Sequence, residues 1–181
     1  MRLFAGIPVP EPARGELRGI LNGLRALEWP VRWTGNDGLH LTLKFYGSVP
    51  GEQVPLISRA LADTTRDSAP IPLTCTGMGH FPSGRMVQVI WVGVDAPGAL
   101  ELLQDRVERA SNALGFPLEG RPFRPPITLG RVRTGEKLSA LDVEKFPAFE
   151  SISFLAERLV LFESRPGSGG SVYTPRATME F

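Results

Sequence analysis

The chain has 181 residues, of which 42% are hydrophobic and 22% charged, and its formal net charge is +1. These values are typical of a globular protein with a substantial core, and they argue against binding of nucleic acid through overall charge. The single cysteine, Cys75, excludes an internal disulfide and a cysteine metal cluster, so a reducing cytoplasm is the expected setting. The N-terminal apolar segment is too short to span a membrane and lacks the features of a signal peptide.

The first seven residues alternate in the manner of a strand. Amphipathic spacing predicts three helices, at 11–28, 51–66 and 97–114, with Gly115 ending the third. Turn chemistry predicts two hairpins, with strands at 71–81 and 85–94 around Pro82-Ser83-Gly84, and at 150–163 and 171–180. The glycine-rich segment 164–170 lacks the spacing and the Lys-Ser/Thr of a P-loop, which favours a plain connection.

The sequence contains a repeat. His40-Leu41-Thr42-Leu43 recurs 86 positions later (126 − 40) as Pro126-Ile127-Thr128-Leu129, and residues 4–7 resemble residues 91–94. We therefore predict an α+β fold of two similar lobes related by a pseudo-twofold axis, each an antiparallel sheet backed by helices, with a central cleft. The chain 1–181 is expected to be one domain of two intertwined lobes, with repeat halves of roughly 1–84 and 85–181.

Alternation along the first repeated strand predicts a polar face and an apolar face. The polar face comprises His40, Thr42, Lys44 and Tyr46, and the apolar, core face comprises Leu41, Leu43 and Phe45. A lone strand histidine is more often exposed or structural, but the repeat favours acid/base work for His40, since imidazole titrates near neutral pH. Lys44 is either a source of positive potential or an ordinary exposed lysine.

The threonine is common to both repeats. Thr42 and Thr128 are therefore predicted to contact phosphate, with simple strand propensity as the alternative. Strict alternation sends Arg131 to the face opposite Thr128 unless a bulge at Gly130 re-aims it. Four arginines form a local basic patch that suits either an RNA end or a solvated loop: Arg121, Arg124, Arg131 and Arg133.

Residues 40–47 (HLTLKFYG) and 121–131 (RPFRPPITLGR) resemble the two motifs of the 2H phosphoesterases. The closest branch is the RNA 2′,3′-cyclic phosphodiesterases, also called 2′-5′ RNA ligases or LigT-like proteins, and the likeness covers nearly the whole chain. It implies a bilobal fold and hydrolysis of terminal 2′,3′-cyclic phosphates on RNA to 2′-phosphates, with no metal or cofactor. Some members also join or cleave 2′-5′ linkages in vitro. The expected partners are RNA 3′ ends or nucleotides with a 2′,3′-cyclic phosphate, not membranes, and the expected state is a monomer.

By this resemblance, His40 is the general acid that protonates the leaving 3′ oxygen. Pro126 occupies the place of the histidine that would activate water. Thr42 and Thr128 would bind the non-bridging phosphate oxygens, and Arg131 would assist. Proline exchanges no proton, although it is acceptable at the first residue of a strand. Three explanations stay open: natural divergence with weak or altered activity, a substituted or erroneous sequence from an active parent, or another group serving as base.

His80 is the only other histidine, and its place near a turn favours an exposed turn residue over a substitute base or a contact to the terminal nucleobase. Phe81 and Tyr46 are candidates for stacking on that base, and Lys44 and Arg124 for further substrate contacts. Two alternatives remain: a non-catalytic module that binds an RNA end or nucleotide, and an enzyme for a small cyclic nucleotide, because the motifs address the phosphate and not the base.

Overall fold

The computed structural model describes residues 1–83, 85–95, 97–143, 146, 148–167 and 170–181. Its helices are α1 (Ala13–Arg25), α2 (Val54–Thr65), α3 (Gly98–Ala113) and α4 (Ala140–Val143). Its strands are β1 (Arg2–Pro8), β2 (Val31–Trp33), β3 (His40–Ser48), β4 (Ile71–Ser83), β5 (Met86–Val94), β6 (Pro126–Val132), β7 (Ile152–Ala156), β8 (Arg158–Gly167) and β9 (Gly170–Glu180).

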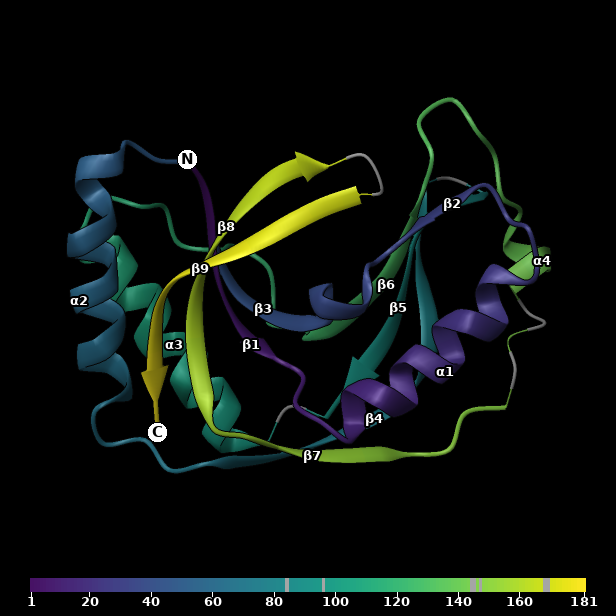
Figure 1. The fold of residues 1–181 in the computed structure, drawn as a ribbon. Helices are drawn as coiled ribbons and strands as arrows, with labels where there is room; N and C mark the ends of the chain where they lie inside the picture. Colours follow the sequence, from purple (N-terminus) through teal and green to yellow (C-terminus); the bar gives the residue numbers. More distant parts are fainter. Residues whose placement is uncertain (84, 96, 144–145, 147, 168–169) are drawn as a thin grey trace.

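The strand order is β7-β4-β5-β6-β3-β1-β8-β9, and β2 pairs with β6 (Figure 1). The first four strands correspond, in reverse order, to the last four. β1 pairs with β3 and β8 in one lobe as β5 pairs with β6 and β4 in the other, and every pair is antiparallel. The lobes meet where Leu41 of β3 pairs with Ile127 of β6. These residues are 86 positions apart (127 − 41), so the pseudo-twofold axis passes between them. The predicted bilobal α+β fold is confirmed.

The helices cross between the repeats. α2 and α3 pack on each other and against β8, β9 and β3, whereas α1 packs against β7 in the opposite lobe. Figure 1 shows α2 and α3 together at one end of the molecule and α1 at the other. Since α1 follows β1 in the chain and α3 follows β5, each repeat sends its first helix to pack against a strand of the other lobe. Each lobe is therefore completed by a helix from the other repeat.

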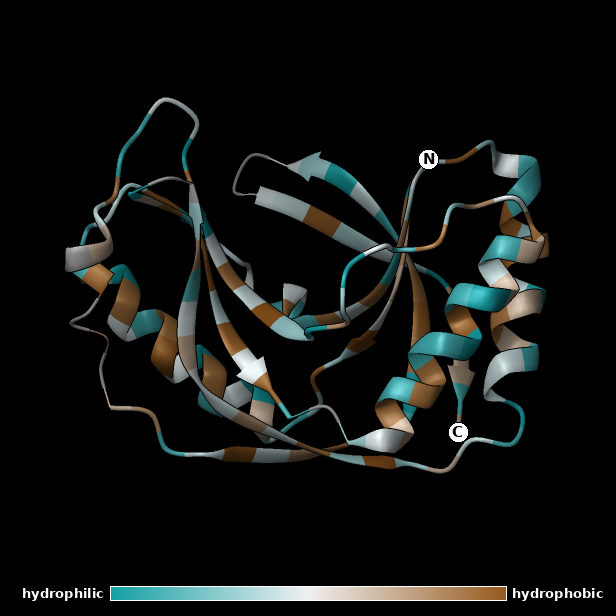
Figure 2. Ribbon diagram, turned by 180° about the vertical axis from the view of Figure 1, so that it is seen from behind, coloured by the Kyte–Doolittle hydropathy of each residue, from teal (hydrophilic) through white to brown (hydrophobic). Residues whose placement is uncertain are grey.

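The helix predictions are confirmed with shorter ends. α1 buries the leucine stripe that its spacing predicts, and α3 does the same. α3 ends two residues before Gly115, whose φ of 90° is the left-handed conformation predicted for the stop. Figure 2 shows apolar residues alternating with polar ones along strands and helices, which is how each element buries one face.

The predicted strand over 150–163 is wrong in one respect. Glu157 interrupts it, and the two parts belong to different lobes, because β7 pairs with β4 while β8 pairs with β1. Alternation shows that a segment is extended, but it does not identify the partner strand. The short β2 and the 3-10 turn Asn36–Gly38 are not evident in the sequence, since their segment has no periodicity. The predicted turn residue Gly84 and residues 168–169 lie outside the described residues.

Candidate active site

A β-bulge at the same position of each repeat decides which side chains reach the cleft. Against β1, Thr42 and Lys44 pair with consecutive residues, so Leu43 is the extra residue. Against β5, Leu129 is the extra residue in the same way, 86 positions later (129 − 43). A bulge reverses the alternation that follows it. The two strands consequently share one burial pattern, and Phe45 and Arg131 become the exposed residues at matching positions.

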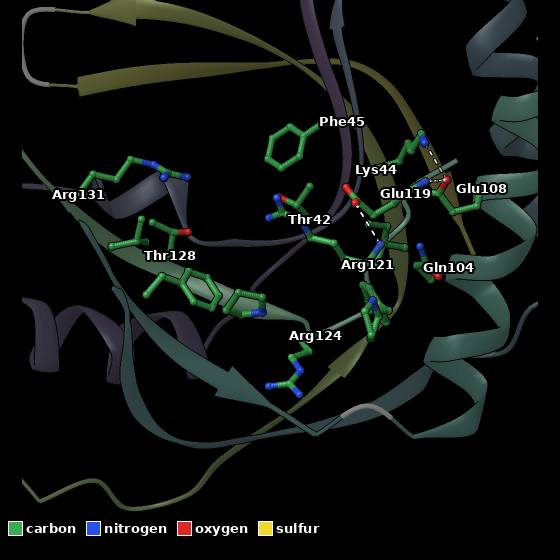
Figure 3. Close-up of a pocket in the computed structure, with 16 residues that line it drawn as sticks. Thr42, Lys44, Phe45, Gln104, Glu108, Glu119, Arg121, Arg124, Thr128 and Arg131 are labelled. Carbon is green, nitrogen blue, oxygen red and sulfur yellow. Dashed lines mark hydrogen bonds and ion pairs between the residues drawn. The ribbon is translucent and has the colours of Figure 1, made fainter. Parts of the chain in front are cut away.

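Two cavities meet at this place. The first, which we call the Pro126 cavity, has a volume of about 600 Å³, and the second, the His40 cavity, has about 660 Å³. His40 lines only the second, and Pro126 lines only the first. Both cavities are lined by Thr42, Phe45, Thr128 and Arg131, which surround the shared space from β3 and β6 (Figure 3). The two positions of the expected acid/base pair thus line different cavities, and these cavities share the residues expected to hold phosphate.

The His40 ring has a fixed tautomer. Its Nδ1 lies 2.6 Å from the carbonyl oxygen of Gly38, and because a carbonyl only accepts, Nδ1–H is the donor. Nε2 is then the nitrogen that exchanges a proton with a ligand. Phe4 stacks on the ring at 4.6 Å between centroids, and Tyr173 meets it edge-on at 5.0 Å. The imidazole is held by its neighbours before any substrate arrives.

This packing shifts the titration of His40. Burial lowers the pKa of the imidazole from its usual 6.5 to about 4. The hydrogen bond to Gly38 opposes that change, and the positive charge of Arg131 lowers the pKa further. Without a bound anion, His40 is therefore neutral at pH 7. An anion placed between His40 and Arg131 would favour the imidazolium and would raise the pKa of His40.

The bulge overturns the predicted faces beyond Leu43. Phe45, expected in the core, is 67% exposed and lines both cavities, whereas Tyr46, expected in the cleft, is only 8% exposed. The Tyr46 hydroxyl hydrogen-bonds Ser111 of α3 at 2.9 Å, and burial raises its pKa to about 12. Tyr46 is thus a core residue and does not line either cavity.

Lys44 is not the exposed cleft lysine that alternation predicts. It is buried, and its Nζ donates to Glu108 Oε2 at 2.7 Å and to the Pro117 carbonyl at 2.5 Å. Its ion pair with Glu108 closes one end of the Pro126 cavity, which both residues line (Figure 3). Its charge is matched by that carboxylate, so it ties β3 to α3.

Arg131 lines both cavities, which is the position that the predicted phosphate contact needs. The predicted bulge is present but falls at Leu129, one residue before Gly130. Gly130 is needed for another reason: a Cβ there would lie 2.5 Å from Val31 and 2.7 Å from Trp33 of β2. Strand β2 can pack beside Arg131 only because Gly130 has no side chain.

The other candidate contacts differ in whether they line a cavity. Phe81 and Arg124 line the Pro126 cavity. His80 pairs with the buried Ile90 and lines neither of the two cavities, and its buried Nδ1 has no hydrogen-bond partner among the residues that the structure describes. Sequence reasoning missed Phe45, although the offset of 86 matches it to Arg131 and would have placed both on the same face. It also missed Tyr173 as a site residue, although the stretch 172–175 is part of the family likeness.

Neither a metal cluster nor a membrane-spanning helix is found in the described part of the chain. Within it, no three His, Cys, Asp or Glu side chains are grouped in a way that could hold a metal ion. Among the same residues, no helix has the length and apolarity required to cross a bilayer.

Comparison with known proteins identifies the family. The family model described as LigT-like phosphoesterase matches residues 7–91 and 92–173. A protein of Methanothermobacter thermautotrophicus named RNA 2′,3′-cyclic phosphodiesterase is 29% identical over 177 residues, covering 96% of this chain and 95% of its own. The crystal structure of Escherichia coli LigT complexed with 3′-AMP superposes with a TM-score of 0.76 at 26% identity, covering 99% of this chain and 97% of its own. A Thermus thermophilus structure gives a TM-score of 0.80 at 25% identity, with coverage of 99% and 97%. The chain therefore belongs to the LigT-like phosphoesterase family, with proline at one of the two repeated motif positions.

Proposed function

We propose that this protein binds RNA ends that carry a 2′,3′-cyclic phosphate and opens the cyclic phosphate to a 2′-phosphate by metal-independent acid/base catalysis. The observation that carries the proposal is the convergence of Thr42, Thr128 and Arg131 on one space, with His40 beside it. Two hydroxyl donors and a guanidinium suit a phosphate with two non-bridging oxygens. Relatives named RNA 2′,3′-cyclic phosphodiesterase supply the substrate class.

In the proposed reaction the cyclic phosphate occupies the shared space. Its negative charge beside Arg131 raises the pKa of His40, and the imidazolium delivers its Nε2 proton to the 3′ oxygen as the P–O3′ bond breaks. Water attacks phosphorus in line with that bond, from the side of the Pro126 cavity. The attacking water loses its proton to solvent, because Pro126 has no group that accepts one. The expected turnover is therefore slower by about 10²–10⁴-fold than with a base at this position.

A second candidate function follows from the same position. Pro126 lines the cavity from which water would attack, so the chain could hold an RNA end or a nucleotide without turning it over. This non-catalytic module would use the same threonines and arginine. Its affinity for 2′-phosphate ends would fall as salt rises, because binding displaces counterions.

The proposed setting is the cytoplasm, and the proposed state is a monomer. The lone cysteine, Cys75, is buried, and burial raises the pKa of its thiol to about 11, which suits an inert core residue in a reducing compartment. An analytical ultracentrifugation run at micromolar concentration would test the monomer.

The function is tested by incubating the protein with a dinucleotide that ends in a 2′,3′-cyclic phosphate and separating the products by chromatography. The wild type is expected to release the 2′-phosphate dinucleotide slowly, and His40→Ala is expected to match buffer. Binding without product in the wild type would favour the module. If the wild type gives no product and shows no binding, both candidate functions are contradicted.

A further inference from the structure

The His40 cavity carries more positive charge than one phosphate requires. Four arginines line it, namely Arg2, Arg32, Arg131 and Arg133, and all four are exposed. No Asp or Glu is among the described residues of its lining. Within the same part of the chain, no ion pair involves any of these four side chains. The cavity therefore presents unneutralised guanidinium groups to whatever enters it.

Two of these arginines face each other. Arg32 of β2 pairs directly with Arg131 of β6, and directly paired residues of antiparallel strands project from the same face. Arg133 lies one residue beyond the end of β6 and lines the same cavity. Like charges directly opposite each other destabilise a sheet, and a bound anion relieves that repulsion. The β2–β6 pairing thus brings together positive charges that bound anionic groups would neutralise.

The opposite wall of the cavity belongs to β1 and to the β8–β9 hairpin. Arg2 and Phe4 come from β1, and Ser164, Ser171 and Tyr173 from the hairpin. A Cβ on Gly170 would lie 3.9 Å from Cδ of Arg32, so this end of the hairpin approaches β2. Figure 1 shows the hairpin reaching from its own lobe toward β2 and β6. Hydroxyl donors and arginines thus line a cavity walled from both lobes.

The Pro126 cavity differs in kind. It contains three phenylalanines, Phe45, Phe81 and Phe123, and its four basic residues stand beside two carboxylates, Glu108 and Glu119. The basic residues are Lys44, Arg121, Arg124 and Arg131. The His40 cavity has four arginines and, among the described residues of its lining, no carboxylate, so it is the more positive of the two and the more favourable side for a polyanion.

We propose that the His40 cavity binds the RNA backbone on the 5′ side of the reacting ribose, with Arg2, Arg32 and Arg133 contacting successive upstream phosphates, so that the substrate is an oligonucleotide end and not a free cyclic mononucleotide. This inference rests on the proposed function, which sets the direction in which the RNA strand runs from the reacting ribose. The leaving 3′ oxygen must lie next to His40, and the ribose attached to it, with the chain leading away from its 5′ carbon, follows into the same cavity. The attacking water needs the opposite side.

Binding measurements test this without requiring turnover. The probes are a pentaribonucleotide with a 3′-terminal 2′-phosphate, the same pentamer with a 3′-hydroxyl and a 5′-phosphate, and a nucleoside 2′-phosphate. The variant R2A/R32A/R133A removes three charges from the cavity and leaves Arg131 in place. The control R59A/R66A/R109A removes three charges from exposed arginines of the α2–α3 region, outside both cavities.

The wild type is expected to bind the 2′-phosphate pentamer roughly tenfold or more tightly than the nucleoside 2′-phosphate or the 5′-phosphate pentamer. The cavity variant should lose this advantage, and its log–log salt slope should flatten by about 2, since each single-strand phosphate contact contributes roughly 0.7. Its affinity for the nucleoside 2′-phosphate should stay within about twofold, and the control should match the wild type.

The inference is overturned if the cavity variant binds the 2′-phosphate pentamer as the wild type does, or if both pentamers lose affinity equally. Failure of the proposed function gives a different result. If the wild type hydrolyses nothing but shows the length-dependent binding, the catalytic proposal fails and this inference stands. If cyclic mononucleotide and pentamer are hydrolysed with equal kcat/KM, this inference fails and the proposed function stands.

Discussion

Leu41 of β3 and Ile127 of β6 pair across the junction of the two lobes, and they occupy the same position in the two repeats. On either side of this pair the repeats supply matching elements: a threonine, a bulged leucine and an exposed residue three positions after the threonine. The residues preceding the pair are His40 and Pro126. The site is therefore symmetric in the two threonines proposed to contact phosphate, and asymmetric at the proposed acid/base positions and at the matching positions of Phe45 and Arg131.

The titration of His40 can be measured directly. Burial and Arg131 lower its pKa to about 4 in the free protein, and a phosphate ligand in the shared space should raise it. In an NMR pH titration, the His40 ring signals should move at about pH 4 without ligand and at higher pH with saturating nucleoside 2′-phosphate. A free-state value near 6.5, or no change with ligand, would contradict the packing around the ring.

The same shift predicts how stability depends on pH. The folded-state pKa of His40 lies below its unfolded value, so below pH 6.5 the unfolded chain binds more protons at this site. His40 should therefore cause the free energy of unfolding to fall as pH falls from about 6.5 to about 4. His40→Gln should remove this component in urea unfolding at pH 7 and pH 5, whereas His80→Gln serves as control. An unchanged pH slope in His40→Gln would refute the assignment.

The backbone of the fold could be predicted from the sequence because its signals are local. Leucine spacing identifies α1 and α3, turn residues identify the β4–β5 hairpin, and the His-x-Thr-x repeat identifies β3 and β6. The partner of a strand is a long-range property, which is why alternation alone does not separate β7 from β8. The repeat predicts that His40, Thr42 and Thr128 lie around one space, whereas Arg131 reaches it because of the bulge at Leu129.

The faces beyond the threonines could not be predicted by alternation. One inserted residue, Leu43, exchanges the positions of Phe45 and Tyr46, and a bulge of this kind leaves no composition signal. A phosphate contact by Arg131 requires a bulge before it. The repeat offset of 86 then implies a matching bulge before Phe45, which alternation alone does not indicate. Arg2 and Arg32 enter the site only through strand pairing with distant segments, so the extent of the His40 cavity is not visible in the sequence.

Gly38 is expected to control the orientation of His40. A Cβ at Gly38 would lie 2.9 Å from Cγ2 of Thr34 and 3.2 Å from Cε2 of Tyr173, and the Gly38 carbonyl accepts the proton of His40 Nδ1. Gly38→Ala should cost about 1–3 kcal/mol of stability and change the pKa of His40. Gly35→Ala, which meets no atom within 4 Å, should be nearly neutral. Urea unfolding and the NMR titration measure both effects, and equal behaviour of the two variants would be the contrary result.

The Lys44–Glu108 pair is expected to be structural. Both partners are buried, so Lys44→Met leaves the carboxylate of Glu108 without its counter-charge, at a cost of about 3–5 kcal/mol. The double variant K44M/E108L should recover much of this loss, because both charges are removed. Asp105→Ala, which breaks the exposed pair with Arg109, should cost less than about 1 kcal/mol. Guanidinium unfolding of the wild type and the three variants measures these losses of stability. A Lys44→Met variant that loses no more stability than Asp105→Ala would contradict the structural role.

Restoring the second histidine tests the central claim most directly. Pro126→His places an imidazole at the position equivalent to His40, on the side from which water attacks. Single-turnover hydrolysis of an oligonucleotide with a 2′,3′-cyclic phosphate should accelerate by about 10²–10⁴-fold over the wild type, with the 2′-phosphate as product. The gain should disappear in P126H/H40A. A Pro126→His protein that folds, binds the 2′-phosphate end as the wild type does and shows no acceleration would contradict the account.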